Sequence, residues 1–141
     1  MAGDTAADVR SLVDQLVDAY SAKHVDRAVA LFADKAVFVG TGADEIRVGR
    51  SAIRSQVERD LTQAETVKAW YDDLEISMRG DAAWLFALVT VEATVGQEVV
   101  TMPMRTTATA TPNGGQWQFR QVHFSLPFSE QAEGESFGSR S

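Results

Sequence analysis

The stretch that most constrains the fold is Ala82–Val95, AAWLFALVTVEATV, which no glycine or proline interrupts. β-Branched and aromatic residues dominate it, as is typical of a strand. Side chains alternate between the two faces of a strand, and the odd positions here are all apolar. The even positions begin apolar, at Trp84 and Phe86, and turn polar after Leu88. We therefore predict a central strand that is covered along one whole face and along half of the other.

The composition is typical of one globular domain. The chain has 141 residues, of which 45% are hydrophobic and 23% charged, so it can bury a core without metals or disulfides. The absence of cysteine and the net charge of −7 argue against thiolate metal sites, nucleic acid and anionic membranes as partners. No apolar run reaches the roughly 20 residues of a membrane span, and the acidic N-terminus has no apolar signal core. We expect a cytoplasmic protein without a cofactor.

The first half of the chain predicts three helices. Thr5 is a candidate cap for the first helix. The buried stripe of that helix follows helical spacing at Val9, Leu12, Val13, Leu16, Val17 and Tyr20. Asp26 is the expected cap of a second, short helix, and Ser51 that of a third. The buried side of the third helix carries Ile53, Val57 and Leu61.

Strands dominate the rest of the chain. Lys35–Val39 predicts a short strand, and Gly40–Gly49 a glycine-rich loop. Later the pattern changes to period two, which predicts strands on both sides of the central one at Val67–Met78, Val99–Thr111 and Gln116–Leu126. Pro112–Gly115 is a hairpin signal. Pro103 cannot donate to a strand ladder, so we expect a bulge or a sheet edge there.

Helices followed by a long meander predict an α+β fold, with residues 1–128 as one domain and 129–141 as a disordered tail. The helices must cover one face of the sheet, which leaves Trp84 and Phe86 on the other face. Large exposed apolar patches usually mark association, so we predict a homodimer formed sheet to sheet. The alternative is a sheet that curls enough to bury these residues itself.

Two stretches carry a resemblance to a known family. VDRAVALFADKAVFVGTGADEIRVGRSAI, Val25–Ile53, and GGQWQFRQVHFSLP, Gly114–Pro127, resemble the opening and the last strand of SnoaL-like domains in the nuclear transport factor 2-like superfamily. The second stretch is also similar to the association domain of calcium/calmodulin-dependent kinase. The resemblance implies a cone-like, curved, antiparallel or mixed sheet wrapped around three N-terminal helices, with an apolar pocket at its wide mouth, and dimers. The superfamily includes isomerases, dehydratases, epoxide hydrolases and cyclases as well as binding modules, and the fold alone does not choose among them.

Acidic residues are scarce where the enzymes of this superfamily place them. The isomerase base follows the first strand, but Gly40 and Thr41 stand there, and no carboxylate comes before Asp44. The epoxide hydrolases need two aspartates and an arginine, and the cyclases a strand aspartate, but no aspartate follows Asp81. We therefore expect a cavity without the acids of its enzymatic relatives. The sequence leaves open whether the protein is an enzyme.

His123 is the catalytic candidate that remains. By strand parity, its face is shared by Trp117, Phe119, Gln121 and Ser125. If that face lines the cone, His123 is an acid/base near neutral pH, with Ser125 beside it; the alternative is a structural histidine. Arg105 either holds an anionic group through its forked donors or covers the sheet with its stem. Whether Arg105 and His123 share a face depends on the hairpin register.

Other polar and aromatic residues allow two interpretations each. Tyr20 ends the first stripe, where it either presents its hydroxyl to a ligand or is a core aromatic with a solvated tip. His24 is expected in a solvated loop. The pair Asp44 and Glu45 has no third ligand nearby, so we predict no metal site. The candidates for core or pocket wall are Phe32, Phe38, Trp70, Met102 and Met104.

The leading hypothesis is a homodimeric domain that binds a small apolar or weakly anionic molecule in its pocket. The candidate ligand-binding residues are Tyr20, Phe38, Trp70, Met104, Arg105, His123 and Ser125. One alternative is an isomerase, cyclase or dehydratase that uses His123 as acid/base. The other is an association module without chemistry.

Overall fold

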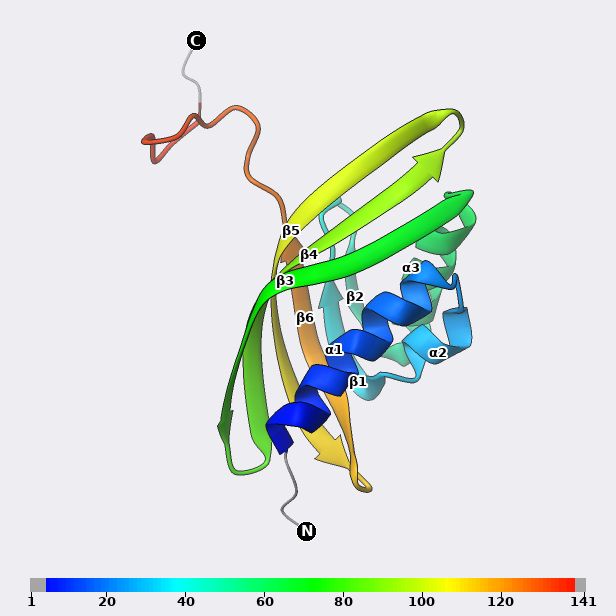
Figure 1. Ribbon diagram of the computed structural model, residues 1–141, viewed down its shortest axis with the longest axis vertical. Helices are drawn as coiled ribbons and strands as arrows, with labels where there is room; N and C mark the ends of the chain where they lie inside the picture. The colour runs from blue at the N-terminus through cyan, green and yellow to red at the C-terminus, as the bar shows by residue number, and fades with distance from the viewer. Residues whose placement is uncertain (1–4, 139–141) are drawn as a thin grey trace.

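The computed structural model describes residues 5–138, in which a curved sheet holds three helices on its concave side (Figure 1). The helices are α1 (Thr5–Ser21), α2 (Val25–Val29) and α3 (Arg50–Thr62). The strands are β1 (Phe32–Val39), β2 (Ile46–Val48), β3 (Thr66–Arg79), β4 (Ala82–Val95), β5 (Glu98–Asn113) and β6 (Gln116–Ser125).

The strands lie in the order β2-β1-β6-β5-β4-β3. β3 to β6 form an antiparallel meander, β1 pairs with β6 in parallel, and β2 is antiparallel to β1. The sheet is therefore mixed. The predicted α+β class and the curved sheet around three N-terminal helices are confirmed (Figure 1).

Two irregularities in strand pairing accompany the curvature. The register of β3 against β4 shifts between Asp72 and Glu75, where Asp73 has a left-handed φ of 56°. The register of β5 against β6 shifts between Thr109 and Ala110. Extra residues of this kind bend a strand and increase its twist, and β3 is bent near its middle in Figure 1. The bend creates the hollow side that receives α1.

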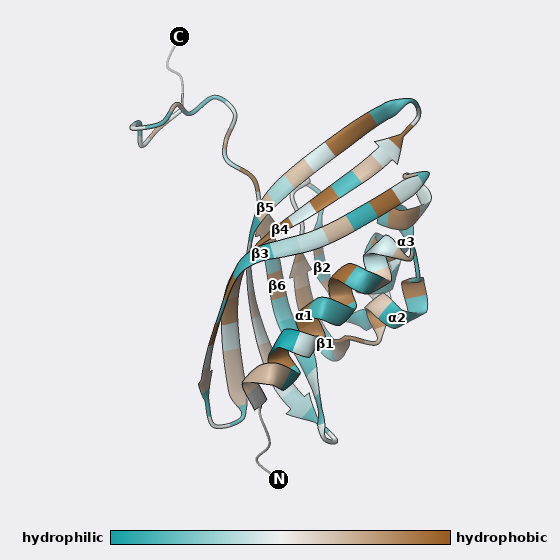
Figure 2. Cartoon of the chain, viewed as in Figure 1, coloured by the Kyte–Doolittle hydropathy of each residue, from teal (hydrophilic) through white to brown (hydrophobic). Residues whose placement is uncertain are grey.

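The core lies between α1 and the concave face. The predicted stripe of α1 is buried, with Val9 fully covered and Leu12 nearly so. Polar and apolar residues alternate along this helix (Figure 2). β4 has the predicted bounds, but it lies next to the edge strand β3 and not at the centre of the sheet. Its odd residues from Ala83 to Val89 are buried in the core. Within this core, the aromatic rings of Phe32 and Phe119 are in contact, with 5.4 Å between their centroids.

Two predicted helix caps are wrong. α2 begins one residue before Asp26, and its cap is His24, whose Nδ1 accepts a hydrogen bond from the backbone N–H of Arg27 at 3.2 Å. His24 is exposed, but it is part of the helix terminus and not of a free loop. α3 begins before Ser51, and its cap is Gly49, with φ of 92° and no side-chain hydrogen bond.

The glycine-rich segment contains a strand that the sequence did not reveal. The N–H of Gly40 donates to the carbonyl of Glu45 at 2.8 Å and closes a turn, after which β2 pairs with β1. The guanidinium of Arg50 then donates to the carbonyl of Phe32 at 2.6 Å and pairs with Asp34 at 2.9 Å. These contacts fix the start of α3 on β1. The strand β1 begins at Phe32, earlier than the predicted start at Lys35.

The predicted strands of the second half are all present. Gly114 and Gly115 form the β5–β6 turn with φ of 61° and 87°, between the paired residues Asn113 and Gln116. Glycine adopts these angles at no steric cost. β5 pairs with β6 only from Arg105 onward, so Pro103 lies where β5 is a sheet edge, as predicted.

The segment after β6 leads away from the sheet and contains no helix or strand up to residue 138 (Figure 1). The predicted tail 129–141 ends outside the described residues, and its disorder stays a prediction. Within residues 5–138, no helix combines the length and apolar character needed to cross a membrane.

Candidate functional site

A cavity of about 230 Å³ lies between the helices and one half of the concave face. The strand side of this cavity is apolar. Its wall includes Val67, Val89, Val91, Met102, Met104 and Phe124. Tyr20 of α1, Asp60 of α3 and Glu45, from the turn before β2, line the opposite side. The cavity therefore has an apolar wall and one polar end.

The polar end is organised by hydrogen bonds to Asp60. The hydroxyl of Tyr20 donates to Asp60 Oδ2 at 2.8 Å, and Gln56 Nε2 donates to Asp60 Oδ1 at 2.7 Å. Gln56 is fully buried, and its Oε1 accepts a hydrogen bond from Arg47 Nε at 3.0 Å. No buried side-chain nitrogen or oxygen atom lacks a partner among the described residues. The site is thus a satisfied network that joins α1, α3 and β2.

Burial raises the pKa of two groups at the polar end, Asp60 and Tyr20. Burial raises the pKa of Asp60 above its ordinary value, although the hydrogen bonds from Tyr20 and Gln56 oppose the shift. Burial also raises the pKa of Tyr20, and the negative charge of Asp60 adds to the shift. Tyr20 therefore keeps its proton near neutral pH and donates a hydrogen bond to Asp60. A buried carboxyl with a raised pKa can accept or donate a proton at a bound molecule.

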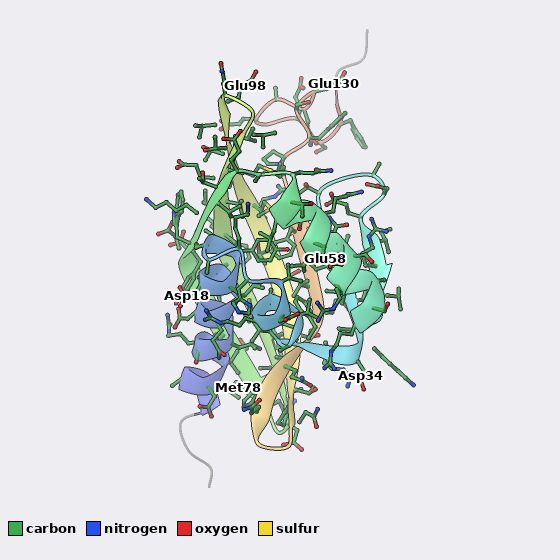
Figure 3. All side chains as sticks on the ribbon, turned by 90° about the vertical axis from the view of Figure 1, so that its right-hand side faces the viewer. Asp18, Asp34, Glu58, Met78, Glu98 and Glu130 are labelled. Atoms are coloured by element: carbon green, nitrogen blue, oxygen red, sulfur yellow. The ribbon has the colours of Figure 1, made fainter. Side chains whose placement is uncertain are left out.

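A second ion cluster flanks the cavity. Arg59 of α3 donates to Glu45 Oε2 at 2.8 Å and to Asp44 Oδ2 at 2.8 Å. These hydrogen bonds raise the pKa of Arg59 and lower that of Asp44. The cluster ties α3 to the turn before β2. Figure 3 shows the helix side of the molecule, where the exposed Asp18 and Glu58 mark α1 and α3, the helices that carry Tyr20 and Asp60.

The sequence predicted a cavity without the acids of the enzymatic relatives, but two other acids, Asp60 and Glu45, line it. The acids that the resemblance implied would lie on or after strands, whereas Asp60 lies on the helix α3. One signal was available in the sequence. Gln56 and Asp60 stand three and seven residues after Ile53, at positions where a buried helical stripe is usually apolar. Polar residues at such positions point to a buried polar network.

The structure places His123 outside the cavity. His123 is exposed and pairs with Thr107 across β5 and β6, whereas Val122 and Phe124 on either side of it are buried. The register shift in the β5–β6 pairing breaks the simple parity of β6, so Phe119 faces the core and does not share the face of His123. On this outer face His123 cannot reach a molecule in the cavity.

The other predicted site residues divide between the two faces. Tyr20, Phe38 and Met104 line the cavity, whereas Trp70 does not. Arg105 lies on the outer face with His123, since it pairs with Ser125, and its Nε donates to Ser125 Oγ at 3.1 Å. An anion held by Arg105 would therefore lie outside the cavity. Within residues 5–138, no group of three potential metal-ligating side chains occurs.

The outer face carries large exposed apolar side chains. Trp84 is 48% exposed and Phe86 is 36% exposed. They pair with Thr109 and Thr107 of β5, and beside them lies a hollow of about 410 Å³ that Gln121 also lines. The helices are on the other side of the sheet (Figure 1), so no helix within residues 5–138 covers these partly exposed rings.

Comparison with known proteins identifies the family and the fold. A family model described as a SnoaL-like domain matches residues 9–129. A structure of a proposed calcium/calmodulin-dependent protein kinase II association domain from Xanthomonas campestris is 22% identical, covers 85% of this chain and 86% of that chain, and has a TM-score of 0.76.

Two further structures share the fold. An NTF2-like protein of unknown function from Pseudomonas putida is 22% identical. The match covers 98% of this chain and 99% of that chain, with a TM-score of 0.76. A proposed dehydratase of the NTF2-like family from Streptomyces avermitilis is 16% identical. The match covers 87% of this chain and 96% of that chain, with a TM-score of 0.79. No functionally curated protein matches the chain. At these identities the likeness concerns the fold alone.

Proposed function

Because this chain belongs to the SnoaL-like domain family of the nuclear transport factor 2-like superfamily, we propose that it binds a small, mostly apolar molecule in the cavity between α1, α3 and the sheet. The observation that carries the proposal is one polar end in an otherwise apolar lining. Ligand sites commonly have this construction, in which apolar walls supply contact area and a few polar groups fix orientation.

The cavity limits the size of the ligand. Its volume is about 230 Å³, and a molecule of liquid water occupies about 30 Å³, so the cavity holds a compact body about as large as eight waters. Phe38 and Met104 would contact the apolar part of such a molecule, and Tyr20 its polar group. A bicyclic ring with one substituent has the required size.

Native mass spectrometry of the freshly purified protein tests the proposal, because it reports retained small molecules and assembly together. Ala93→Phe should abolish retention, since Ala93 lines the cavity and a larger side chain would fill it. Thr94→Phe is the matched control, because the next residue of β4 points to the opposite face. Equal retention by the wild type and Ala93→Phe would contradict a ligand site in this cavity.

We also propose that two copies associate through the outer sheet face. The exposed Trp84 and Phe86 support this proposal, as does the likeness to a proposed association domain. The face also carries Glu75 next to Phe86 and Arg105 near His123, so it offers charges of both signs for pairing with a second copy. This association would hold whether or not the cavity binds a ligand.

Light scattering after size exclusion tests the association. The wild type should have twice the 15.3 kDa mass of one chain. Trp84→Lys should shift the mass toward one chain, because it replaces an exposed apolar ring of this face with a charge. Val99→Lys is the control, since Val99 is 63% exposed but lies beyond the β5–β6 pairing, near the tip of the β4–β5 hairpin. A monomeric wild type would refute the proposal.

A further inference from the structure

Three groups at the polar end, Tyr20, Asp60 and Glu45, act as hydrogen-bond acceptors toward a ligand, whereas Thr41 and Gln63, which also line the cavity, can donate as well. The hydroxyl hydrogen of Tyr20 is used by Asp60, so the Tyr20 oxygen is left only as an acceptor. Each carboxylate oxygen of Asp60 takes one donor from the protein, and a carboxylate can accept about four hydrogen bonds. Glu45 likewise offers acceptors only. These three groups can receive hydrogen bonds from a ligand but cannot donate one while their present bonds hold.

Positive charge is kept out of the cavity. Of the described residues that line it, none is lysine, arginine or histidine. Lys23 donates to the carbonyl of Ala64, a lining residue, at 2.6 Å. At the polar end, Arg59 is held by Asp44 and Glu45, and the Nε of Arg47 is bonded to Gln56. Both guanidinium groups are already engaged by protein acceptors. A ligand carboxylate entering the cavity would meet two acidic side chains and no free cation.

We infer that the cavity selects an apolar molecule that ends in a hydrogen-bond donor, with an amine favoured over an alcohol and a carboxylate rejected. The inference rests on the proposed ligand-binding function and names the ligand class for it. A protonated amine would donate to Asp60 and to the oxygen of Tyr20, while its ring system would lie against Val89, Val91 and Met104. A carboxylate of the same shape could receive hydrogen bonds from Thr41 and Gln63, which also line the cavity, but it would place a third negative charge beside Asp60 and Glu45 without a lining cation to balance it.

A ligand that ends in an amine differs from the weakly anionic molecule expected from the sequence. That expectation depended on Arg105, which lies on the outer face of the sheet. The groups that face Asp60 come from three elements: Tyr20 from α1, Gln56 and Arg59 from α3, and Glu45 from the turn before β2. Acid would protonate Asp60 and weaken the pairing with an ammonium group, while an alcohol would be affected much less.

Three probes with the same ring test the inference: naphthylmethylamine, naphthylmethanol and naphthoate, with affinities measured by isothermal calorimetry near neutral pH. We expect the amine to bind about tenfold tighter than the alcohol, as one charge-assisted hydrogen bond allows, and naphthoate to bind more weakly than both. Asp60→Asn should reduce the amine preference to about threefold or less. Asp14→Asn should leave it unchanged, because Asp14 accepts the hydroxyl of Tyr71 outside the cavity.

The outcomes separate the two proposals. If no probe binds, the ligand-binding function fails, and the inference fails with it. If naphthoate binds as tightly as the amine, or if the amine preference survives in Asp60→Asn, the cavity binds ligands but the selection proposed here is refuted. If Asp60→Asn does not fold, acid titration of the wild type replaces it. The amine affinity should then fall with pH while the alcohol affinity holds, and a parallel response of both would contradict the role of Asp60.

Discussion

Replacing Tyr20 with phenylalanine should lower the free energy of unfolding by about 2 kcal/mol near neutral pH. The lost contact is the 2.8 Å hydrogen bond from the Tyr20 hydroxyl to Asp60. Hydrogen bonds to charged groups contribute about 1.5–3 kcal/mol, and the loss is largest where water cannot replace the donor. After the substitution, Gln56 would be the remaining side chain that donates to Asp60 among the bonds seen here.

The decrease in the free energy of unfolding caused by Tyr20→Phe should depend on pH. Burial raises the pKa of Asp60 in the folded protein, so the folded state binds this proton more tightly than the unfolded state. The associated stabilisation is fully present below the unfolded pKa and is lost as pH rises through the folded pKa. The hydroxyl of Tyr20 stabilises the charged carboxylate and opposes this loss. Tyr20→Phe should therefore destabilise most above the folded pKa of Asp60 and least in acid.

Urea unfolding at several pH values measures the effect, and the chain supplies a matched control. Tyr71 of β3 donates to Asp14 of α1 at 2.6 Å, the same pair of residue types outside the cavity. Tyr71→Phe should cost less than about 1 kcal/mol, because water can replace its hydroxyl there.

A double-mutant cycle with Asp60→Asn isolates the Tyr20 contact. Since the asparagine side chain of that variant cannot ionise, Tyr20→Phe should cost about 1 kcal/mol less in that background. Equal costs for the two tyrosines, or a cost of Tyr20→Phe that does not change with pH, would refute the reasoning.

Other parts of the molecule give further expected outcomes. His24→Ala should lower the free energy of unfolding in urea by about 1 kcal/mol, because it removes a helix cap, whereas His123→Ala on the exposed outer face should change it by less than about 0.5 kcal/mol. Phe32→Ala should cost about 4 kcal/mol, since Phe32 is fully buried, and thermal melting should show a large decrease in Tm. Gly115→Ala should cost about 1 kcal/mol in the same assay, because φ there is 87°; an unchanged Tm would contradict this account of the turn.

The elements that the sequence predicted well are those with long, uniform periodicity. α1 carries a helical stripe, and the odd positions of β4 are all apolar, so local pattern and burial agree in α1 and in the first half of β4, from Ala83 to Val89. The short elements were harder to predict. β2 has only three residues and is specified by the closing of a turn onto β1, a tertiary contact that leaves no period in the sequence.

The faces of the last two strands could not be derived from parity. Parity holds only while the pairing is regular, and the shift between Thr109 and Ala110 lets both Phe119 and Val122 face the core. Nothing in the composition of β6 marks the irregularity. The same shift answers the open question of register, because Arg105 pairs with Ser125 and Thr107 pairs with His123, which puts Arg105 and His123 on one face.

The inner and outer faces of the same strands can be altered separately, which makes the two proposals independent. Asp60 and Val89 belong to the cavity, whereas Trp84 lies on the outer face, with the backbone of β4 between the two sets. Substitutions without shared contacts are usually additive. Trp84→Lys should therefore change the mass in solution without changing the preference for an amine, and Asp60→Asn should do the reverse. A substitution that changed both properties would show that the hollow and the outer sheet face act as one unit.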